Sequence, residues 1–549
     1  MIPLRQLLLR LRTRRYRGLI QRLVFIGSRI LLALLVLLAL RQLYNGVKLY
    51  RAGAHLRAAK TAAQDLRSLL QSAGLRQCFA SIADGKGAHS NLCDAASQFL
   101  SRIQAAGLVL PLPQTGGVFT VPGICAGGCF LATNVRDAEL VMPNYIYHTV
   151  LTVASLTHHG NPAFVSVYES GSKDRTPAWL QVLGDVLDAL SVPHHLELHG
   201  TIQREKGEER IHFLARVRSA ALLPLYQLCS ATGQFCAPPT GGRRNSNINS
   251  INSIDSSSSS SFNSSGRVIF LNDVLFTGAD VLRLLQYPAD LVCGLDLGMA
   301  AEPDMTVAEH RDTLTAYLHA RWLLPRGLAR RLARWGPLRK RWRKFHHTHE
   351  PLLREYGPLF FYDKWVARDI SGRMFTNRAP YVVYEPSVAR VVAGRPVRVH
   401  CCWNGLAVIT AQPFVERAVD FREHREDECS ASECSLLCDD MWRLGYDNMI
   451  MDPNVRVTYD LAGANKLFKS LSTPLPLGVP GVAYAPFRQT DVREAMSLPK
   501  HDDISRESSN VGGPGKRMRE VDCCDLKKGA DMVEFRDEGV CHTSMVVVG

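Results

Sequence analysis

The sequence predicts an α/β protein with a mostly parallel sheet, joined on its N-terminal side to a single membrane-spanning helix. From about residue 118 onward, short apolar runs alternate with amphipathic patterns of helical period, and this order favours parallel strands linked by helices. The chain of 549 residues is 46% hydrophobic, which is enough for a large core. One long apolar run, Leu23 to Leu40, has close to the length that a membrane helix needs.

The positive charge of the chain is concentrated near its N-terminus. Residues 1–60 hold 13 Arg or Lys and no acidic residue, against a net charge of +14 for the whole chain. The remaining residues are therefore close to neutral. A basic footprint for nucleic-acid phosphates along the body of the protein is absent.

We expect residues 1–22 to form a cytosolic basic arm and residues 23–40 to form a retained membrane anchor. About 20 apolar residues span a bilayer, and Arg29 stands near the start of the run, where it can reach the interface. Basic residues stay on the cytosolic side, so the rest of the chain is expected across the membrane. A cleaved signal peptide and a buried helix are the alternatives, although no small-x-small cleavage pattern follows Leu40.

After the anchor, the composition divides the chain into three parts. Residues 41–115 are rich in Ala and Leu and predict a helical stem, residues 116–495 form the main α/β domain, and residues 496–549 predict a disordered tail. In the main domain we expect strands over Phe164–Ser170, His195–Gly200, Arg267–Phe276 and Asp290–Gly298, and helices over Pro177–Val192, Arg210–Leu225 and Gly278–Gln286.

Two segments interrupt the main domain. Residues 240–266 are dominated by Ser and Asn and predict a disordered loop. Residues 321–344 carry ten Arg or Lys and no acidic residue. This basic insertion is typical of a solvated helix pair, and contact with anionic lipid headgroups, a phosphorylated partner or nucleic acid are the alternatives.

The 15 cysteines favour an oxidising compartment. Local disulfides are possible for Cys125 with Cys129, for Cys229 with Cys236, and within the trio Cys429, Cys434 and Cys438. Buried free thiols are the alternative. No CxxC pair or zinc-type Cys/His repeat is present.

Polar residues stand where the expected parallel strands end, and ligands of such sheets bind at the carboxyl ends of strands. Carboxylate oxygens there could hold a divalent ion, Mn²⁺ or Mg²⁺, that bridges a nucleotide-sugar diphosphate, and Arg218 could balance the diphosphate charge. The alternative for Asn272 and Asp273 is a simple turn cap. The candidate residues are Glu169, Ser170 and Gly171 after the first strand, Asn272 and Asp273 after the third, and Asp296 in the fourth.

Several stretches together resemble the fungal capsule-associated, or cryptococcal α-1,3-mannosyltransferase, family over about residues 118–460. The resemblance implies a type II Golgi membrane protein with a lumenal GT-A domain over 116–495. It also implies transfer of mannose from GDP-mannose in α-1,3 linkage, with retention, to a mannose-containing glycan of the cell wall, the capsule or a glycolipid. No nucleic-acid partner is expected. The stretches are FLATNVRD (130–137), FVSVYESGSKDRT (164–176), HFLARVRSAALLPL (212–225), VIFLNDVLF (268–276), DLVCGLDLG (290–298), FYDKWVARDISGRMF (361–375), VHCCWNGLAVITAQPF (399–414) and residues 428–460.

The metal motif of many GT-A enzymes is Asp-x-Asp, and the matching stretch here is Leu271-Asn272-Asp273. Only the second acidic position is kept. The resemblance therefore assigns the metal to Asp273, and it places Glu169, Ser170 and Arg218 near the donor nucleotide.

Downstream residues are candidates for the acceptor site. Tryptophan rings, guanidinium forks and carboxylates recognise the faces and hydroxyl edges of sugars. Glu433 could hydrogen-bond the reacting acceptor hydroxyl, or it could belong to a helix start. For the tryptophans the alternative is core packing. The acceptor candidates are Trp365, Arg368, Asp369, Trp403 and Asn404.

Two other functions fit the same residues. The first is the same chemistry with another nucleotide sugar as donor. The second is a catalytically silent membrane partner of a glycosyltransferase, which the incomplete acidic motif keeps open. A phosphate-binding loop, a G-x-S-x-G elbow and an HExxH motif are absent from the sequence.

Overall fold

The structure is a computed structural model of the whole chain. It describes residues 127–233, 266–298, 322–348, 359–426, 428–459, 487–497, 517–526 and 541–548, together with short pieces before residue 127 and single residues between these ranges. The chain divides into two units, Met1–Ala58 and Ala59–Gly549.

The expected membrane anchor lies almost wholly outside the described residues. Of that segment only Val36, Leu37 and Leu40 are described, and they are helical and exposed. In the described part of the chain, no helix has the length and apolar character needed to cross a bilayer. The Ser/Asn loop of residues 240–265 also lies outside the described residues, as does most of the expected stem.

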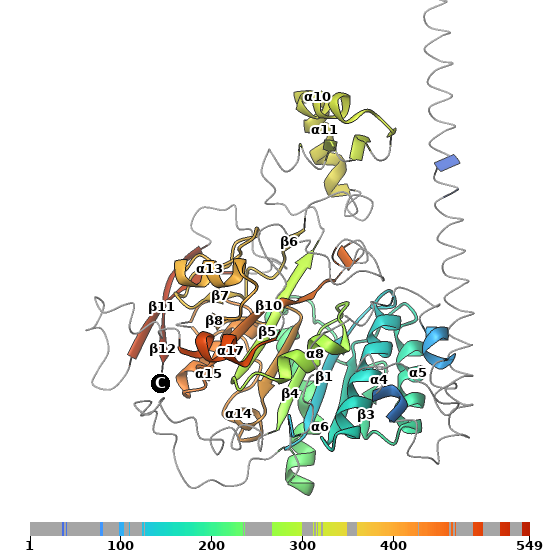
Figure 1. The fold of residues 1–549 in the computed structure, drawn as a ribbon, viewed down its shortest axis with the longest axis vertical. Coiled ribbons are helices and arrows are strands. Elements are labelled where there is room, and N and C mark those ends of the chain that lie inside the picture. The colour runs from blue at the N-terminus through green and yellow to red at the C-terminus, as the bar shows by residue number, and fades with distance from the viewer. Residues whose placement is uncertain are drawn as a thin grey trace, which may run out of the picture. The chain divides into compact units, whose positions relative to one another are not determined.

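A large, mostly parallel sheet forms the centre of the second unit (Figure 1). Its strand order is β3-β2-β1-β4-β9-β5-β10-β8-β7, and β6 pairs with β5. The strands are β1 (Cys129–Val135), β2 (Ala163–Glu169), β3 (His194–Glu197), β4 (Arg267–Leu271), β5 (Leu291–Gly298), β6 (Phe360–Phe361), β7 (Arg368–Asp369), β8 (Val397–Cys401), β9 (Leu406–Thr410) and β10 (Met449–Val457).

The strands β3, β2, β1 and β4 pair in parallel, and so do β5 and β10. The strand β9 runs antiparallel to both of its neighbours, β4 and β5. Its insertion leaves β4 and β5 pointing the same way, so their carboxyl ends meet at one edge of the sheet. This confirms the expected strands around Asp273 and Asp296. A buried strand after Gly405 was also expected, but its antiparallel direction was not.

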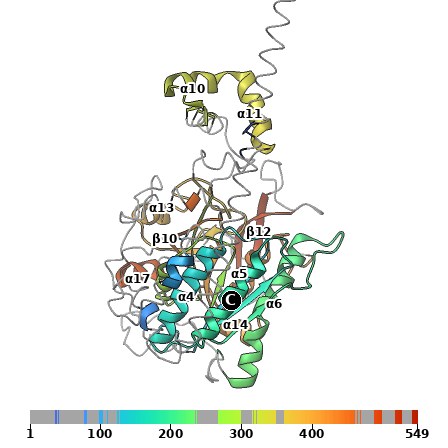
Figure 2. The ribbon, with the colours of Figure 1, turned by 90° about the vertical axis from the view of Figure 1, so that its right-hand side faces the viewer.

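Helices cover both faces of the sheet. In β1, Thr133 accepts a hydrogen bond from Tyr145 of α4 at 2.8 Å. The preceding residue, Ala132, pairs in register with Ser166 of β2. The hydroxyl of Ser166 donates to the carbonyl of Ala221 in α6 at 2.7 Å. Successive side chains of a strand point to opposite faces, so α4 and α6 lie on opposite sides of the sheet (Figure 2). These helices are α4 (Met142–His158), α5 (Thr176–Ala189), α6 (Arg210–Thr232), α8 (Gly278–Leu285), α13 (Glu385–Val392), α14 (Gln412–Val415), α15 (Glu433–Arg443) and α17 (Gln489–Ser497).

Local sequence signals set the ends of these helices. Proline occupies the first turn of α4 and of α5, where its missing N–H costs nothing. The side chains of Thr277 and Asp280 form a reciprocal capping box at the start of α8. The helix α6 runs past the predicted end at Leu225, through Pro224, and stops at Gly233 with φ of +69°.

The basic insertion folds as two helices, α10 (Arg326–Arg334) and α11 (Gly336–Thr348), which confirms the predicted helix pair. The chain beyond residue 496 differs from the predicted disordered tail. Two strands, β11 (Arg517–Cys524) and β12 (Cys541–Val548), pair antiparallel there. The polar composition of this segment gave no sign of these strands. A disulfide between Cys524 and Cys541 joins the two strands, and another between Cys523 and Cys429 links them to the main domain.

The disulfides agree only in part with the local pairs suggested by the sequence. Cys125 bonds Cys129 as expected, and Cys229 is disulfide-bonded. The trio does not pair within itself. Cys429 bonds Cys523, Cys438 bonds Cys401, and Cys434 is a buried free thiol. Cys434 and Cys438 lie one turn apart on the helix α15, which holds their backbones in place while β8 brings Cys401 to the second of them.

Candidate functional site

Asn272 is held where β4 ends. Its backbone N–H donates to the carbonyl of Gly405 at 2.9 Å, and its side-chain amide donates to the hydroxyl of Tyr459 at 2.8 Å. The indole of Trp403 donates to the amide oxygen of Asn272 at 3.3 Å. Thr277 and Asp280 cap α8. The N–H of Val274 donates to the carbonyl of Asn272 at 2.8 Å, so the turn role that the sequence left open for Asn272 and Asp273 stays an alternative.

Three carboxylates converge near this strand end. Burial raises the pKa of Asp273 above its ordinary value, although the charge of Arg218 lowers it. Asp296, in β5, is completely buried, and burial followed by the charge of Asp363 raises its pKa well above the ordinary value. Burial raises the pKa of Asp363 to about 6. The charges of all three carboxylates, after burial, raise the pKa of Tyr459.

Asp296 and Asp363 are linked through the backbone. The N–H of Asp363 donates to one carboxylate oxygen of Asp296 at 3.3 Å, and the N–H of Tyr362 donates to the carbonyl of Asp296 at 3.1 Å. The second carboxylate oxygen of Asp296 is buried and has no hydrogen-bond partner among the described residues. A buried, unpaired carboxylate oxygen is costly unless a proton or a cation meets it.

These carboxylates could hold a divalent cation, since oxygen ligands are the ones that Mn²⁺ and Mg²⁺ prefer. The carboxylate oxygens of Asp273, Asp296 and Asp363 do not form a group whose members all lie within 4.8 Å of one another. Within the described ranges, the one group of three potential ligand atoms that lie within 4.8 Å of one another is Cys429, Cys523 and Asp525. Its two cysteines form a disulfide, so that group does not offer two thiolates.

Arg218 of α6 lies beside the carboxylates and is almost fully buried. Its Nε atom is 3.1 Å from Oε1 of Glu433, and its guanidinium also contacts the sulfur of Cys434. The guanidinium carbon stands 4.8 Å from the ring centroid of Trp403 and 5.7 Å from that of Phe270. Aromatic faces and a carboxylate therefore fix a permanent positive charge next to Asp273 and Asp363.

Glu433 occupies the first turn of α15, and Ser432 is the N-cap. The hydroxyl of Ser432 accepts from the N–H of Cys434 at 3.4 Å and donates to Oε2 of Glu433 at 3.0 Å. The sequence left open a capping role for Glu433. In the structure Ser432 caps the helix, and the carboxylate of Glu433 pairs with Arg218.

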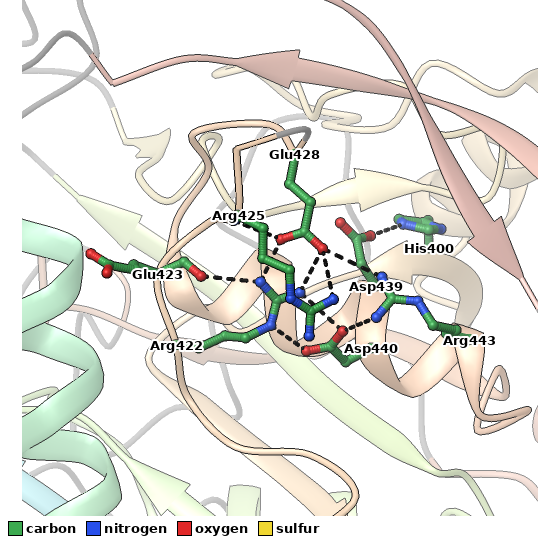
Figure 3. A network of polar contacts seen from close by, with 8 residues as sticks. All are labelled: His400, Arg422, Glu423, Arg425, Glu428, Asp439, Asp440 and Arg443. Atoms are coloured by element: carbon green, nitrogen blue, oxygen red, sulfur yellow. Dashed lines mark hydrogen bonds and ion pairs between the residues drawn. The ribbon is translucent and has the colours of Figure 1, made fainter.

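An ion-pair network fixes the segment before α15 against that helix (Figure 3). The guanidinium of Arg422 donates to both carboxylate oxygens of Asp440, at 2.7 and 3.0 Å, and also to Glu428 at 2.5 and 3.0 Å. Arg443 adds a bond to Asp440 at 2.6 Å. This network holds the chain leading to Ser432 and so supports the position of Glu433.

Glu169, Ser170 and Gly171 lie at the end of β2, and β1 separates that strand from β4. The carboxylate of Glu169 accepts backbone N–H groups from Ser172 and, at 2.8 Å, from His199. Gly171 has φ of +71°, which side chains rarely adopt. Glu169 therefore ties together the loops after β2 and β3, and the structure does not bring it into the Asp273 cluster.

The predicted acceptor residues Trp365, Arg368 and Asp369 are engaged in holding their own loop. Trp365 donates to the carbonyl of Cys524 at 2.9 Å, and Arg368 donates to four backbone carbonyls. Asp369 accepts from the backbone of Ser371, Arg373, Val383 and Tyr384 and from the hydroxyl of Ser371. Burial lowers the pKa of Arg368 to about 10, against the charge of Asp522.

That loop borders an open groove of about 570 Å³. The groove begins one residue after Asp363, and Asp369 shapes it by fixing the backbone on both of its sides. It is lined by Lys364, Arg373, Met374, Phe375, Thr376, Asn377, Val383 and Asp522.

Trp403 and Asn404 make different contacts. Trp403 contacts both Asn272 and Arg218, as described above. Asn404 has φ of +54° and donates to the carbonyl of Gly294 at 2.7 Å, so it fixes the turn between β8 and β9. Asp363 and Tyr459 were not among the predicted site residues, although both lie in stretches that carried the family resemblance, FYDKWVARD and VTYD.

Fold and site together define an α/β protein with an acidic site beside a fixed arginine, at the carboxyl ends of strands where such sheets bind ligands. Residues 128–440 match the model of the family described as cryptococcal mannosyltransferase 1, and the chain belongs to this family.

The chain is also similar to a curated fungal protein, the Alpha-1,3-mannosyltransferase CMT1 of Cryptococcus neoformans var. neoformans serotype D (strain JEC21 / ATCC MYA-565). The two are 30% identical over 356 residues, which cover 61% of this chain and 58% of that protein. The match thus spans little more than half the length of the relative. No solved structure matches the chain.

Proposed function

We propose that the protein is a retaining glycosyltransferase with a GT-A-like domain that moves mannose from GDP-mannose in α-1,3 linkage to a mannose-containing glycan. The family and the name of the curated relative support mannose transfer. The observation that carries the proposal is the placement of Asp273 after β4 and Asp363 after β6 near Arg218, with Asp296 of β5 bound to the N–H of Asp363. A divalent cation and a fixed arginine can each balance the charge of a diphosphate, and this arrangement supplies residues for both.

Mn²⁺ or Mg²⁺ would be held by Asp273 together with Asp296 and Asp363. The buried, unpaired oxygen of Asp296 and the raised pKa values, which burial causes first, fit a cation at this place. When bound, such an ion stabilises the negative charge that develops on the departing diphosphate. Asn272 holds the hydroxyl of Tyr459 and the indole of Trp403 beside these carboxylates.

Arg218 is positioned to balance charge on the donor diphosphate. Its partner Glu433 holds the guanidinium from the side of α15, at 3.1 Å, which fixes its direction before the substrate arrives. The side chain of Glu433 is buried, so we expect it to act on the reaction through Arg218. It would contact the acceptor directly only if the acceptor separated it from Arg218. Glu169, Ser170 and Gly171 shape the loops on the opposite side of β1, where we place the nucleotide.

The acceptor glycan is expected in the groove that begins beside Asp363. Its lining offers the cations of Lys364 and Arg373, the amide of Asn377 and the ring of Phe375, a mixture that suits sugar hydroxyls and C–H faces. Trp365, Arg368 and Asp369 would then act by holding the groove in shape, and Trp403 by supporting Arg218.

We place the protein in the Golgi as a type II membrane protein with a lumenal domain, anchored by residues 23–40. The disulfides Cys293–Cys402, Cys401–Cys438 and Cys429–Cys523 support an oxidising compartment. The near-neutral body of the chain argues against a nucleic-acid partner.

Release of GDP from GDP-mannose by the purified full chain tests the proposal, with and without Mn²⁺, chelator and an α-mannoside. We expect Mn²⁺-dependent release that Asp273→Asn lowers by about a hundredfold or more, the scale of one lost electrostatic contact in a transition state. Asp188→Asn, an exposed aspartate on α5, is the matched control and should leave the rate unchanged. A well-folded protein that releases nothing from any nucleotide sugar would instead be a silent partner of another enzyme.

A further inference from the structure

The helices α10 and α11 carry a surface that the proposed transfer reaction does not use. Their inner face is already occupied, because Ala333 and Trp342 are buried in a small cluster with Leu314 and with Tyr317 packed against it. Next to the buried Ala329 and Ala333, Leu328 and Leu332 of α10 and Trp335, the residue at which α10 ends, follow one another at intervals of four and three residues. This spacing puts them on one face of a helix.

Large apolar side chains on this face are exposed. Leu328 and Trp335 keep 46% and 59% of their surface open, and just before the helix Trp322 and Leu323 keep 66% and 87%. Four exposed large apolar side chains thus fall within 14 positions of the chain. Exposed apolar side chains that gather in this way mark interaction surfaces. We name Trp322, Leu323, Leu328 and Trp335 the apolar stripe.

Basic residues alternate with the residues of the apolar stripe along the chain. Residues 322–342 contain seven Arg or Lys and no Asp or Glu. In α10, Arg326, Arg330, Arg331 and Arg334 are exposed. The surface therefore combines tryptophan and leucine side chains with a continuous positive charge, and the segment itself contains no acidic residue that could neutralise that charge.

We propose that α10 and α11 dock on an anionic membrane surface. The apolar stripe would enter the boundary between headgroups and acyl chains, where Trp side chains are favoured, and the arginines of α10 would contact lipid phosphates. A soluble polyanion could pair with the arginines as well, but it would leave Leu323 and Leu328 in water. The exposed leucines therefore favour a lipid surface. This inference does not rest on the proposed mannose transfer, and in the proposed topology the surface is an anionic lumenal leaflet.

The test follows trypsin cleavage within residues 326–341 of the full chain, mixed with phosphatidylcholine vesicles that contain or lack phosphatidylserine. We expect phosphatidylserine to slow cleavage in this segment by about tenfold, since several basic residues each gain attraction to an anionic surface. Cleavage at the exposed Lys206, in the loop before α6, should keep its rate and thereby control for loss of protease activity.

A second arm separates lipid docking from simple charge pairing. The triple change Trp322→Ser, Leu323→Ser and Trp335→Ser keeps every positive charge and should abolish the protection by phosphatidylserine. Leu140→Ser with Leu444→Ser, two exposed leucines elsewhere, is the matched control and should keep it. Equal cleavage rates with and without phosphatidylserine would overturn the proposal. So would protection by soluble polyphosphate that equals the lipid effect and survives the triple change.

Discussion

Arg218 of α6 and Glu433 of α15 form a buried ion pair, with 3.1 Å between Nε and Oε1. The pair joins two helices that are 215 residues apart in the sequence, and it stands beside the carboxylates at the ends of β4 and β5. Removal of one partner of a buried pair leaves an uncompensated charge, which costs more than replacement of both.

Removing one partner of this pair should therefore destabilise the protein more than removing both partners together. We expect Arg218→Met to lower the free energy of unfolding by about 3–5 kcal/mol, and Arg218→Met with Glu433→Leu to lower it by less than the sum of the two single changes. Urea unfolding followed by tryptophan fluorescence measures both. Arg417→Met, which removes an exposed cation from the ring of Tyr226, is the control, with an expected loss of about 1 kcal/mol or less. Additive losses at Arg218 and Glu433 would mean that the two do not interact.

The carboxylates predict a characteristic pH dependence. Burial raises the pKa of Asp363 to about 6 from an ordinary value of 3.8, so the folded protein favours its protonated form. This contribution to stability is therefore greatest below about pH 4 and is lost as the pH rises through about 6. In chelator, the melting temperature should fall between about pH 4 and pH 6, and Asp363→Asn should reduce that fall.

Metal binding should show the opposite trend, because a divalent ion prefers ionised carboxylates. We expect Mn²⁺ to raise the melting temperature of the full chain at about pH 7 and to have little effect at about pH 5. Asp363→Asn should remove most of the effect at the higher pH, while Asp188→Asn should retain it. Stabilisation of equal size at both pH values would place the metal elsewhere.

The network around Arg422 predicts a difference between arginine and lysine. Arg422 contacts two carboxylates with paired hydrogen bonds, a geometry that a lysine ammonium does not reproduce. Arg422→Lys should lower the free energy of unfolding by about 1–3 kcal/mol. The exposed side chain of Arg425 makes a long bond of 3.4 Å to Glu428. Arg425→Lys should therefore change the free energy of unfolding by less than about 0.5 kcal/mol. Chemical unfolding of the two variants gives the comparison, and equal losses would contradict the ranking.

The disulfide arrangement can be checked by peptide mapping. After unfolding without reductant, alkylation should label Cys434, and the digest should contain a linked pair from Cys401 and Cys438. The native protein should leave Cys434 unlabelled, since its thiol is buried. A linked pair of Cys429 with Cys434 would contradict this arrangement and restore the local pairing that the sequence suggests.

Sequence reasoning predicted the part of the site that depends on local pattern. The runs before Asp273 and around Asp296 read as buried strands, and parallel strands bring their carboxyl ends together. The helix carrying Arg218 was likewise visible from its period. These residues needed no knowledge of distant contacts beyond the strand order.

Asp363 and Tyr459 could not be found in this way. Asp363 follows a long connection after β5, and its N–H meets Asp296 across 67 positions. Tyr459 meets Asn272 across 187 positions. Neither has a local pattern that distinguishes it from an ordinary polar residue in a loop.

The prediction of the acceptor residues was limited as well, because the composition of a loop does not distinguish between two roles. A motif with Trp365, Arg368 and Asp369 has the composition of a sugar-binding loop, and it has equally the composition of a loop held by its own side chains. The carbonyls around Arg368 and the N–H groups around Asp369 exist only once the loop is folded. A role for these residues at the acceptor therefore remains a prediction that the groove beside them makes testable.

The most direct measurement is the product formed from GDP-mannose and an α-mannoside acceptor by the full chain with Mn²⁺, with its linkage read by nuclear magnetic resonance. The account predicts a new α-1,3-linked mannose from the wild-type protein and almost none from Asp273→Asn or Asp363→Asn, with Asp188→Asn as active as the wild type. An unchanged yield from both site variants, or transfer of a different sugar in place of mannose, would contradict it.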